Sequence, residues 1–261
     1  MVDIRKAATV LLVRPSEKGP ELFMLQRPGR GVFPDLHVFP GGKVDQEDAD
    51  LEASCFGLNE QLAARKLGLK DNAIRYWVTV IRECFEESGV LLVRRQGKDF
   101  YFRDDAERSH YQGLRERLLA GELDFATIIG SEGLELATDR VHYFSHWITP
   151  ETAPARFDTR FFLAAMPRGQ QAVGDDRETV SGEWISPTEA LQRHERGDWQ
   201  MIYPTLTTLN SVADFGSVEA LVDSVQEGFQ FDTVTPELHR QGMQHLQNEQ
   251  VRRRKGSNQQ R

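Results

Sequence analysis

The stretch IRECFEESGV, residues 81–90, places three carboxylates on one side of a predicted helix. Glu83, Glu86 and Glu87 are spaced i, i+3 and i+4, so their side chains converge on a narrow arc of the helix surface. Like charges at that spacing repel one another. The arc is therefore either a solvated acidic face or a place where a cation binds. Ligands that are all oxygen suit a hard ion such as Mg²⁺ or Mn²⁺.

The composition of the chain limits the classes of partner. The 261 residues are 39% hydrophobic and 28% charged, which is ordinary for a soluble protein, and the net charge is −8. This acidic balance argues against a nucleic-acid partner, which usually requires a basic face. No apolar run is long enough to span a membrane, so we expect no membrane partner.

The chain shows no sign of secretion. Its two cysteines do not make a disulfide framework, and the N-terminal stretch lacks the pattern of a signal peptide. The last three residues, QQR, are not a peroxisomal Ser-Lys-Leu address. We therefore expect a cytoplasmic protein, and we leave open whether it is a homodimer.

Apolar runs separated by glycine and proline predict strands, then a helix, then more strands and more helices. That order is typical of a mixed sheet between helical layers, in the α/β class. The predicted strands cover 6–14 and 21–27, which form a hairpin, then 90–95, 141–149, 157–166 and 179–186. The predicted helices cover 72–88, 187–196, 204–214 and 217–227, with partly helical segments over 45–70 and 104–138.

Capping residues set the ends of two of these helices. Asp71 is the predicted N-cap of the helix that carries the glutamates, and Gly89 is its C-cap. The later helix begins at Ser186, which is followed by Pro187, and it stops at Gly197.

A glycine pair precedes the acidic helix in HVFPGGKVDQED, residues 37–48. Gly41 and Gly42 let the backbone turn tightly and approach a ligand, and a bare carbonyl there can join a metal shell. Together the two stretches resemble the Nudix box, whose pattern is G-x5-E-x7-R-E-U-x-E-E-x-G-U, with U a bulky apolar residue. The second half matches at Arg82, Glu83, Glu86, Glu87, Gly89 and Val90.

The first half of the box departs from the pattern in two ways. The position six residues after Gly42 holds Asp48 rather than glutamate. The seven-residue spacer becomes residues 49–81, which is 26 residues more than the pattern has. In addition, Cys84 fills a U position and is smaller than usual.

A split box of this kind resembles the branch of peroxisomal coenzyme A diphosphatases in the Nudix superfamily. Four further stretches resemble that branch in the same order, so the likeness covers roughly residues 7–225. They are LFMLQRPGRGVFPDLHVFPGG (22–42), HWITPETAPARFDTRFFLAAM (146–166), EWISPTEAL (183–191) and YPTLTTLNSVADFGSVEAL (203–221).

The resemblance implies a Nudix α/β/α sandwich around a mixed sheet. The domain would cover residues 1–230, with an insertion in the box over about 49–72 and a C-terminal helical extension over about 204–230. Residues 231–261 are expected to form a polar, flexible tail.

The resemblance also implies roles for the box residues. Glu86, Glu87 and the carbonyl of Gly41 would hold the metal, Mg²⁺ or Mn²⁺. Glu83 would be a further ligand or the base that activates water, and Arg82 would orient it. Asp48 would assist as a shorter carboxylate, with a contact to the metal through water.

Four residues outside the box are weaker candidates. Glu178 lies six residues before Trp184, a spacing seen in other Nudix proteins, and is either an extra ligand or base or a surface acid. Arg27 ends a predicted strand near the box and would meet a phosphate unless it is only a surface residue. Arg156 and Arg160 would bind the ribose phosphate of coenzyme A, unless Asp158 simply pairs with one of them.

The function that the resemblance implies is a metal-dependent pyrophosphohydrolase of nucleoside diphosphates linked to another group. The favoured substrate is coenzyme A or acyl-coenzyme A, cleaved to 3′,5′-ADP and (acyl-)4′-phosphopantetheine. The alternatives are a Nudix hydrolase of ADP-ribose, NADH or dinucleoside polyphosphates, and a sensor that binds a nucleotide without cleaving it.

Overall fold

Strand β1 (Ile4–Ser16) is the axis of the central sheet in the computed structural model, which describes residues 3–29, 35–153, 155–174, 181–228 and 234–244. It forms the predicted hairpin with β2 (Gly19–Gln26) and runs parallel to β9 (Arg156–Ala165). The main path of the sheet is β10-β2-β1-β9-β8, in which β8 is Val141–Ile148 and β10 is Ser181–Ile185. Two short strands, β3 (His37–Val38) and β4 (Gly41–Lys43), pair with β2 and β1.

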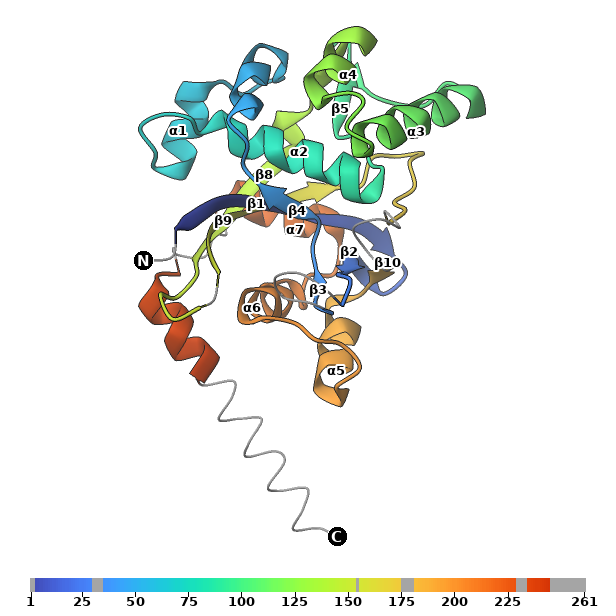
Figure 1. Ribbon diagram of the computed structural model, residues 1–261. Coiled ribbons are helices and arrows are strands. Elements are labelled where there is room, and N and C mark those ends of the chain that lie inside the picture. The colour runs from blue at the N-terminus through green and yellow to red at the C-terminus, as the bar shows by residue number, and fades with distance from the viewer. Residues whose placement is uncertain (1–2, 30–34, 154, 175–180, 229–233, 245–261) are drawn as a thin grey trace, which may run out of the picture.

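Helices cover both faces of this sheet (Figure 1). Helix α2 (Ile74–Ser88) lies on one face, and α5 (Pro187–Arg196), α6 (Tyr203–Val212) and α7 (Val218–Gln226) lie on the other. Strand β1 is buried on both sides, because Val10 and Leu12 join the core under α2 whereas Leu11 and Val13 join the opposite core. The predicted α/β/α sandwich with a mixed sheet is confirmed.

A second, three-stranded sheet lies beyond α2. Its strands are β5 (Val93–Arg95), β6 (Lys98–Asp99) and β7 (Leu134–Leu136). Helices α3 (Asp105–Leu119) and α4 (Phe125–Glu132) accompany it, and the short turn η2 (Thr138–Arg140) leads back to β8. The predicted strand over 90–95 is present as β5, but only over its last three residues. The sequence did not predict β6 and β7, which are two and three residues long, and it predicted part of this region, 104–138, as helical.

The insertion in the box folds into the 3₁₀ helix η1 (Glu47–Ser54) and helix α1 (Glu60–Leu67). The structure of this insertion shows that the predicted N-cap of α2, Asp71, is wrong. The carboxylate of Glu60, and not that of Asp71, accepts hydrogen bonds from the backbone N–H groups of Ala73 and Ile74, each at 2.9 Å. Asp71 instead accepts a bond from the side chain of Asn72. A glutamate 13 residues upstream in the chain therefore replaces the local cap.

The other predicted caps are confirmed. Gly89 ends α2 with a left-handed φ of 71°, and its N–H donates to the carbonyl of Phe85. Ser186 accepts a bond from the N–H of Glu189 at the start of α5, and Gly197 ends that helix with a φ of 84°. These backbone angles favour glycine.

Part of the predicted tail, residues 234–244, has defined secondary structure. Val234 exchanges backbone hydrogen bonds with His146 and Ile148 at the edge of β8, and residues 236–244 are helical. His239 is 5% exposed and packs against Trp147, 5.7 Å between ring centroids. The backbone of Val234 and the buried imidazole of His239 thus attach this largely polar segment to the sheet, a signal that composition does not carry. No helix in the described part of the chain is long and apolar enough to cross a membrane.

The capping role of Glu60 predicts a loss of stability. We expect Glu60→Ala to lower the free energy of unfolding by about 1–2 kcal/mol, because two backbone donors at the start of α2 lose their acceptor. Urea denaturation measures this change. Asp50→Ala, at an exposed acid of the same insertion, should change the free energy by less than about 0.5 kcal/mol. Equal effects of the two substitutions would contradict the capping role.

Candidate active site

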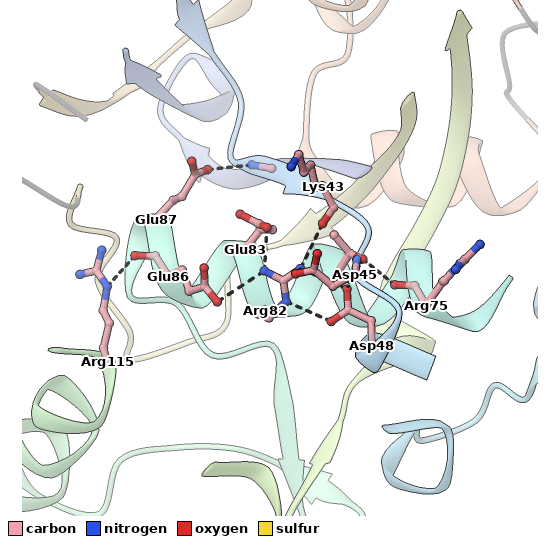
Figure 2. A network of polar contacts seen from close by, with 11 residues as sticks. Lys43, Asp45, Asp48, Arg75, Arg82, Glu83, Glu86, Glu87 and Arg115 are labelled. Atoms are coloured by element: carbon pink, nitrogen blue, oxygen red, sulfur yellow. Dashed lines mark hydrogen bonds and ion pairs between the residues drawn. The ribbon is translucent and has the colours of Figure 1, made fainter. Parts of the chain in front are cut away.

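Strand β4 lies against the acidic face of α2 (Figure 2). The N–H of Gly41 donates to Glu87 Oε2 at 2.7 Å. A Cβ atom at Gly42 would collide with the carboxylate of Glu83, so a side chain at this position would displace that carboxylate. The glycine pair therefore allows the backbone to approach two of the three glutamates. The predicted role of the Gly41 carbonyl in a metal shell stays a prediction.

Arg82 lies at the centre of the site. Its Nη1 is 2.7 Å from Glu83 Oε1 and 3.5 Å from Glu86 Oε1. Its Nη2 donates to the carbonyl of Lys43 at 3.1 Å, which joins the end of β4 to the helix. One guanidinium thus orients two of the predicted metal ligands and the loop that follows the glycines.

Asp48 holds Arg82 in this place. Asp48 is 4% exposed, and its carboxylate accepts hydrogen bonds from Arg82 Nε at 3.0 Å and from Arg82 Nη2 at 3.1 Å. The hydroxyl of Thr79 donates to it at 2.6 Å, and the N–H of Asp45 at 3.1 Å. In the described structure Asp48 is thus a partner of the arginine, and the predicted contact with a metal through water stays a prediction.

The burial of Glu83 shifts its titration. Removal from water raises the pKa of Glu83 to about 7, the positive charge of Arg82 opposes this rise, and the negative charge of Glu86 adds to it. Burial alone would lower the pKa of Arg82, but its hydrogen bonds to Asp48 and the nearby carboxylates raise it above its ordinary value. Arg82 is therefore always charged, whereas Glu83 exchanges its proton near neutral pH.

The donors at this site fit a hard cation in kind. Three carboxylates lie within two turns of one helix, and a backbone carbonyl is close by. However, no three His, Cys, Asp or Glu side chains of the described chain are arranged to hold an ion. Glu83 faces Arg82, and Glu87 accepts the Gly41 N–H. To hold a metal, these carboxylates must exchange protein partners for the ion.

The structure does not join every predicted residue to this site. Arg27 is exposed just after β2, and its backbone N–H donates to the carbonyl of Leu36. Glu178 lies outside the described residues. Its role as an extra ligand or base stays a prediction.

Two arginines of β9 form internal contacts. Arg156 Nε donates to the carbonyl of Thr149 at 3.3 Å. Arg160 is 4% exposed and donates to Asp158 at 2.6 Å and to the hydroxyl of Tyr76 at 3.2 Å. This arrangement favours the alternative in which Asp158 pairs with Arg160 within the fold.

Two residues near the box have packing roles. His37 is buried and stacks on Trp199 with 4.0 Å between ring centroids. Cys84 is fully buried, and burial raises the pKa of its thiol to about 12. A thiol of that pKa is not a nucleophile at neutral pH.

Sequence reasoning missed Thr79 and Arg115. The Thr79 hydroxyl fixes Asp48, and its spacing three residues before Arg82 on the same helix was a usable signal. Arg115 of α3 donates to the carbonyl of Glu86 at 3.0 Å across 29 residues of sequence, and no spacing rule indicates such a contact.

This fold, with a glutamate helix packed against a glycine turn, defines a Nudix hydrolase. A crystal structure of a NUDIX hydrolase from Alicyclobacillus acidocaldarius has the same fold, with a TM-score of 0.69 and 25% identity over 86% of this chain and 98% of that one. Residues 69–211 match the NUDT19 Nudix domain. The chain belongs to this family.

Curated relatives carry a more specific name. The chain is similar to acyl-coenzyme A diphosphatase NUDT19 of Gallus gallus, with 26% identity over 83% of this chain and 70% of that protein. It is similar to the Homo sapiens protein of the same name, with 25% identity over 79% of this chain and 64% of that one. The matched region therefore leaves about a third of each relative uncovered.

The buried pair of Asp48 and Arg82 predicts a large stability effect. We expect Asp48→Ala to lower the free energy of unfolding by about 3 kcal/mol, because Arg82 loses its bidentate partner in a buried place. Urea denaturation tests this expectation. Asp45→Ala is the matched control, since Asp45 is 56% exposed and 3.4 Å from Arg82, and it should cost less than about 1 kcal/mol. A small effect of Asp48→Ala would show that the pair contributes little.

The raised pKa of Glu83 predicts a pH dependence. The folded protein holds this proton up to about pH 7, whereas the unfolded chain releases it near 4.5, so wild-type stability falls as pH rises between those values. Glu83→Gln removes the titration. In metal-free buffer its stability relative to wild type should therefore rise, by roughly 3 kcal/mol at most, between pH 4.5 and 8. A stability difference between Glu83→Gln and wild type that does not change with pH would contradict the raised pKa. The control, Glu219→Gln, should show the same pH dependence of stability as wild type.

Proposed function

We propose that the chain hydrolyses the diphosphate of coenzyme A or acyl-coenzyme A. The products are 3′,5′-ADP and 4′-phosphopantetheine or its acylated form. The proposal rests on the family to which the chain belongs and on the name of its curated relatives. The observation that carries it is the intact acidic face of α2, with Glu83, Glu86 and Glu87 set against the Gly41–Gly42 turn.

A divalent cation, Mg²⁺ or Mn²⁺, belongs to this proposal. Glu83, Glu86, Glu87 and the carbonyl of Gly41 would hold it. Such an ion neutralises the diphosphate and lowers the pKa of water. The donors of the site agree with a hard ion in kind, which is the support that the structure offers.

The residues of the chain would divide the remaining work. Glu83 would accept a proton from the attacking water, and its pKa near neutrality suits a general base. Arg82 orients Glu83, and Asp48 with Thr79 keeps Arg82 in place. Arg27 would meet a phosphate of the substrate, and Glu178 would supply a further ligand or base.

The remaining predictions concern the setting of the enzyme. A small nucleotide diphosphate is the proposed partner, in agreement with the family. The cytoplasmic location remains a prediction, and whether the chain forms a homodimer stays open.

Product analysis tests the proposed function. With Mg²⁺ or Mn²⁺, the wild-type chain should release 3′,5′-ADP from coenzyme A and acetyl-coenzyme A faster than it cleaves ADP-ribose or NADH. Glu87→Gln should lower kcat by about 100-fold or more, because a predicted metal ligand loses its charge. Chromatography of the products gives both results.

The control is Glu219→Gln, at an exposed glutamate of α7. It should keep the wild-type rate. Faster cleavage of ADP-ribose, NADH or a dinucleoside polyphosphate would replace the substrate but keep the class. Nucleotide binding by calorimetry without turnover under either ion would favour the sensor.

A further inference from the structure

The C-terminal end of α2 needs partners from elsewhere in the fold. The last four carbonyl groups of a helix have no intrahelical N–H to bind. In α2 the carbonyl of Phe85 accepts the N–H of Gly89, and that of Ser88 accepts the N–H of Val173 at 2.8 Å. The carbonyl of Glu86 accepts Arg115 Nε at 3.0 Å. The turn that carries Glu86 and Glu87 is therefore fixed by other segments.

Arg115 joins three segments of the chain at this point. It extends from α3, and while Nε binds Glu86, its Nη2 donates to the carbonyl of Val173 at 3.2 Å. The segment that holds Val173 is itself tied to the end of α2, because Gln170 exchanges two hydrogen bonds with the backbone of Leu91. The guanidinium, whose contact with Glu86 is drawn in Figure 2, thus connects the acidic turn to α3 and to the segment of Val173.

The sequence of α2 leaves room for this contact. A Cβ atom at residue 89 would lie 3.1 Å from Arg115 Nη1, so Gly89 lets the guanidinium approach the helix end as well as adopting a φ of 71°. A cation at a helix C-terminus also interacts favourably with the helix dipole. Arg115 is therefore held by geometry and by charge.

We infer that Arg115 is a positioning residue for Glu86 and Glu87. By holding the Glu86 carbonyl, it sets the orientation of the last turn of α2, and with it the directions of the two carboxylates. Small displacements of such groups have large effects, because partners that orient metal ligands change affinity or activity by about 10- to 100-fold. The inference rests on the proposed function in one respect, the role of these glutamates as metal ligands.

Charge and geometry predict opposite changes in metal affinity. A guanidinium close to an acidic site repels a divalent cation, so its removal should tighten metal binding if only its charge matters. If the hydrogen bond positions the glutamates, its removal should weaken metal binding. The sign of the change therefore distinguishes the two roles.

Three substitutions of Arg115 separate the contributions. Arg115→Met keeps an unbranched side chain as far as the position of Nε and removes both the donors and the charge. Arg115→Lys keeps the charge but has no donor at the Nε position, whereas Arg115→Gln is uncharged and places its amide nitrogen at that position. Positioning through Nε predicts that Gln restores function and Lys does not.

The test is Mn²⁺ binding to the full chain, measured by electron paramagnetic resonance of the free ion, together with kcat and KM for acetyl-coenzyme A. We expect Arg115→Met and Arg115→Lys each to weaken Mn²⁺ binding and to lower kcat by about tenfold, with KM nearly unchanged. Arg115→Gln should stay within about threefold of wild type in both Mn²⁺ affinity and kcat. Arg117→Met is the control on the same helix, since Arg117 is 54% exposed and pairs with Glu122. It should behave as wild type.

Several results would overturn the inference. Tighter Mn²⁺ binding by Arg115→Met and Arg115→Gln, with Arg115→Lys equal to wild type, would show that Arg115 acts on the metal site through its charge alone. A rise in KM alone would make it a substrate contact, and a lower melting temperature with unchanged Mn²⁺ binding would make it a structural brace. If Arg115→Met does not fold, the Lys and Gln pair still decides. Wild type that binds Mn²⁺ but cleaves no coenzyme A compound would refute the proposed substrate and leave the Mn²⁺ series readable.

Discussion

The ion pair between Arg82 and Asp48 is the contact on which the site depends. Glu83, Glu86 and Glu87 repel one another on one helix face, and Arg82 is the cation among them. A buried arginine is costly unless its donors are satisfied. Arg82 donates hydrogen bonds to the Asp48 carboxylate and to the Lys43 carbonyl, and the hydroxyl of Thr79 in turn donates to Asp48. The cluster therefore connects η1, β4 and α2 into one unit around the acidic face.

The fold supports this cluster by fixing α2 at both ends. At its start Glu60 of the insertion supplies the acceptor, and at its end Arg115 and Val173 supply donors. Between them, β4 approaches the helix so closely that a side chain at residue 42 would displace the Glu83 carboxylate. The residues between the two halves of the box thus form a support for the helix. They pack at its N-terminal end, away from the turn that carries Glu86 and Glu87.

Local signals in the sequence predicted the elements well. Alternating apolar runs, Gly89, Ser186 and Gly197 each act over a few residues, and the structure confirms them. The failures involve contacts between distant residues. Glu60 replaces Asp71 as the cap of α2, Arg115 reaches Glu86 from another helix, and His239 attaches a polar segment to β8. At the candidate site the residue types followed from the motif. The ion pair between Asp48 and Arg82 could not be predicted from the motif, because it depends on where η1 places Asp48 in the fold.

The parallel pairing of β1 with β9 has a consequence for synthesis of the protein. Ile4 pairs with Arg156 and Val13 with Ala165, so the middle of the sheet is made of segments that leave the ribosome far apart in time. Parallel neighbours of this kind need a long crossover, and contacts between distant segments form slowly. Until β9 emerges, the backbone N–H and C=O groups along one edge of β1 have no strand to pair with. The β1–β2 hairpin must therefore avoid association with other chains until the ribosome has made β9. By that time more than half of the protein has been synthesised.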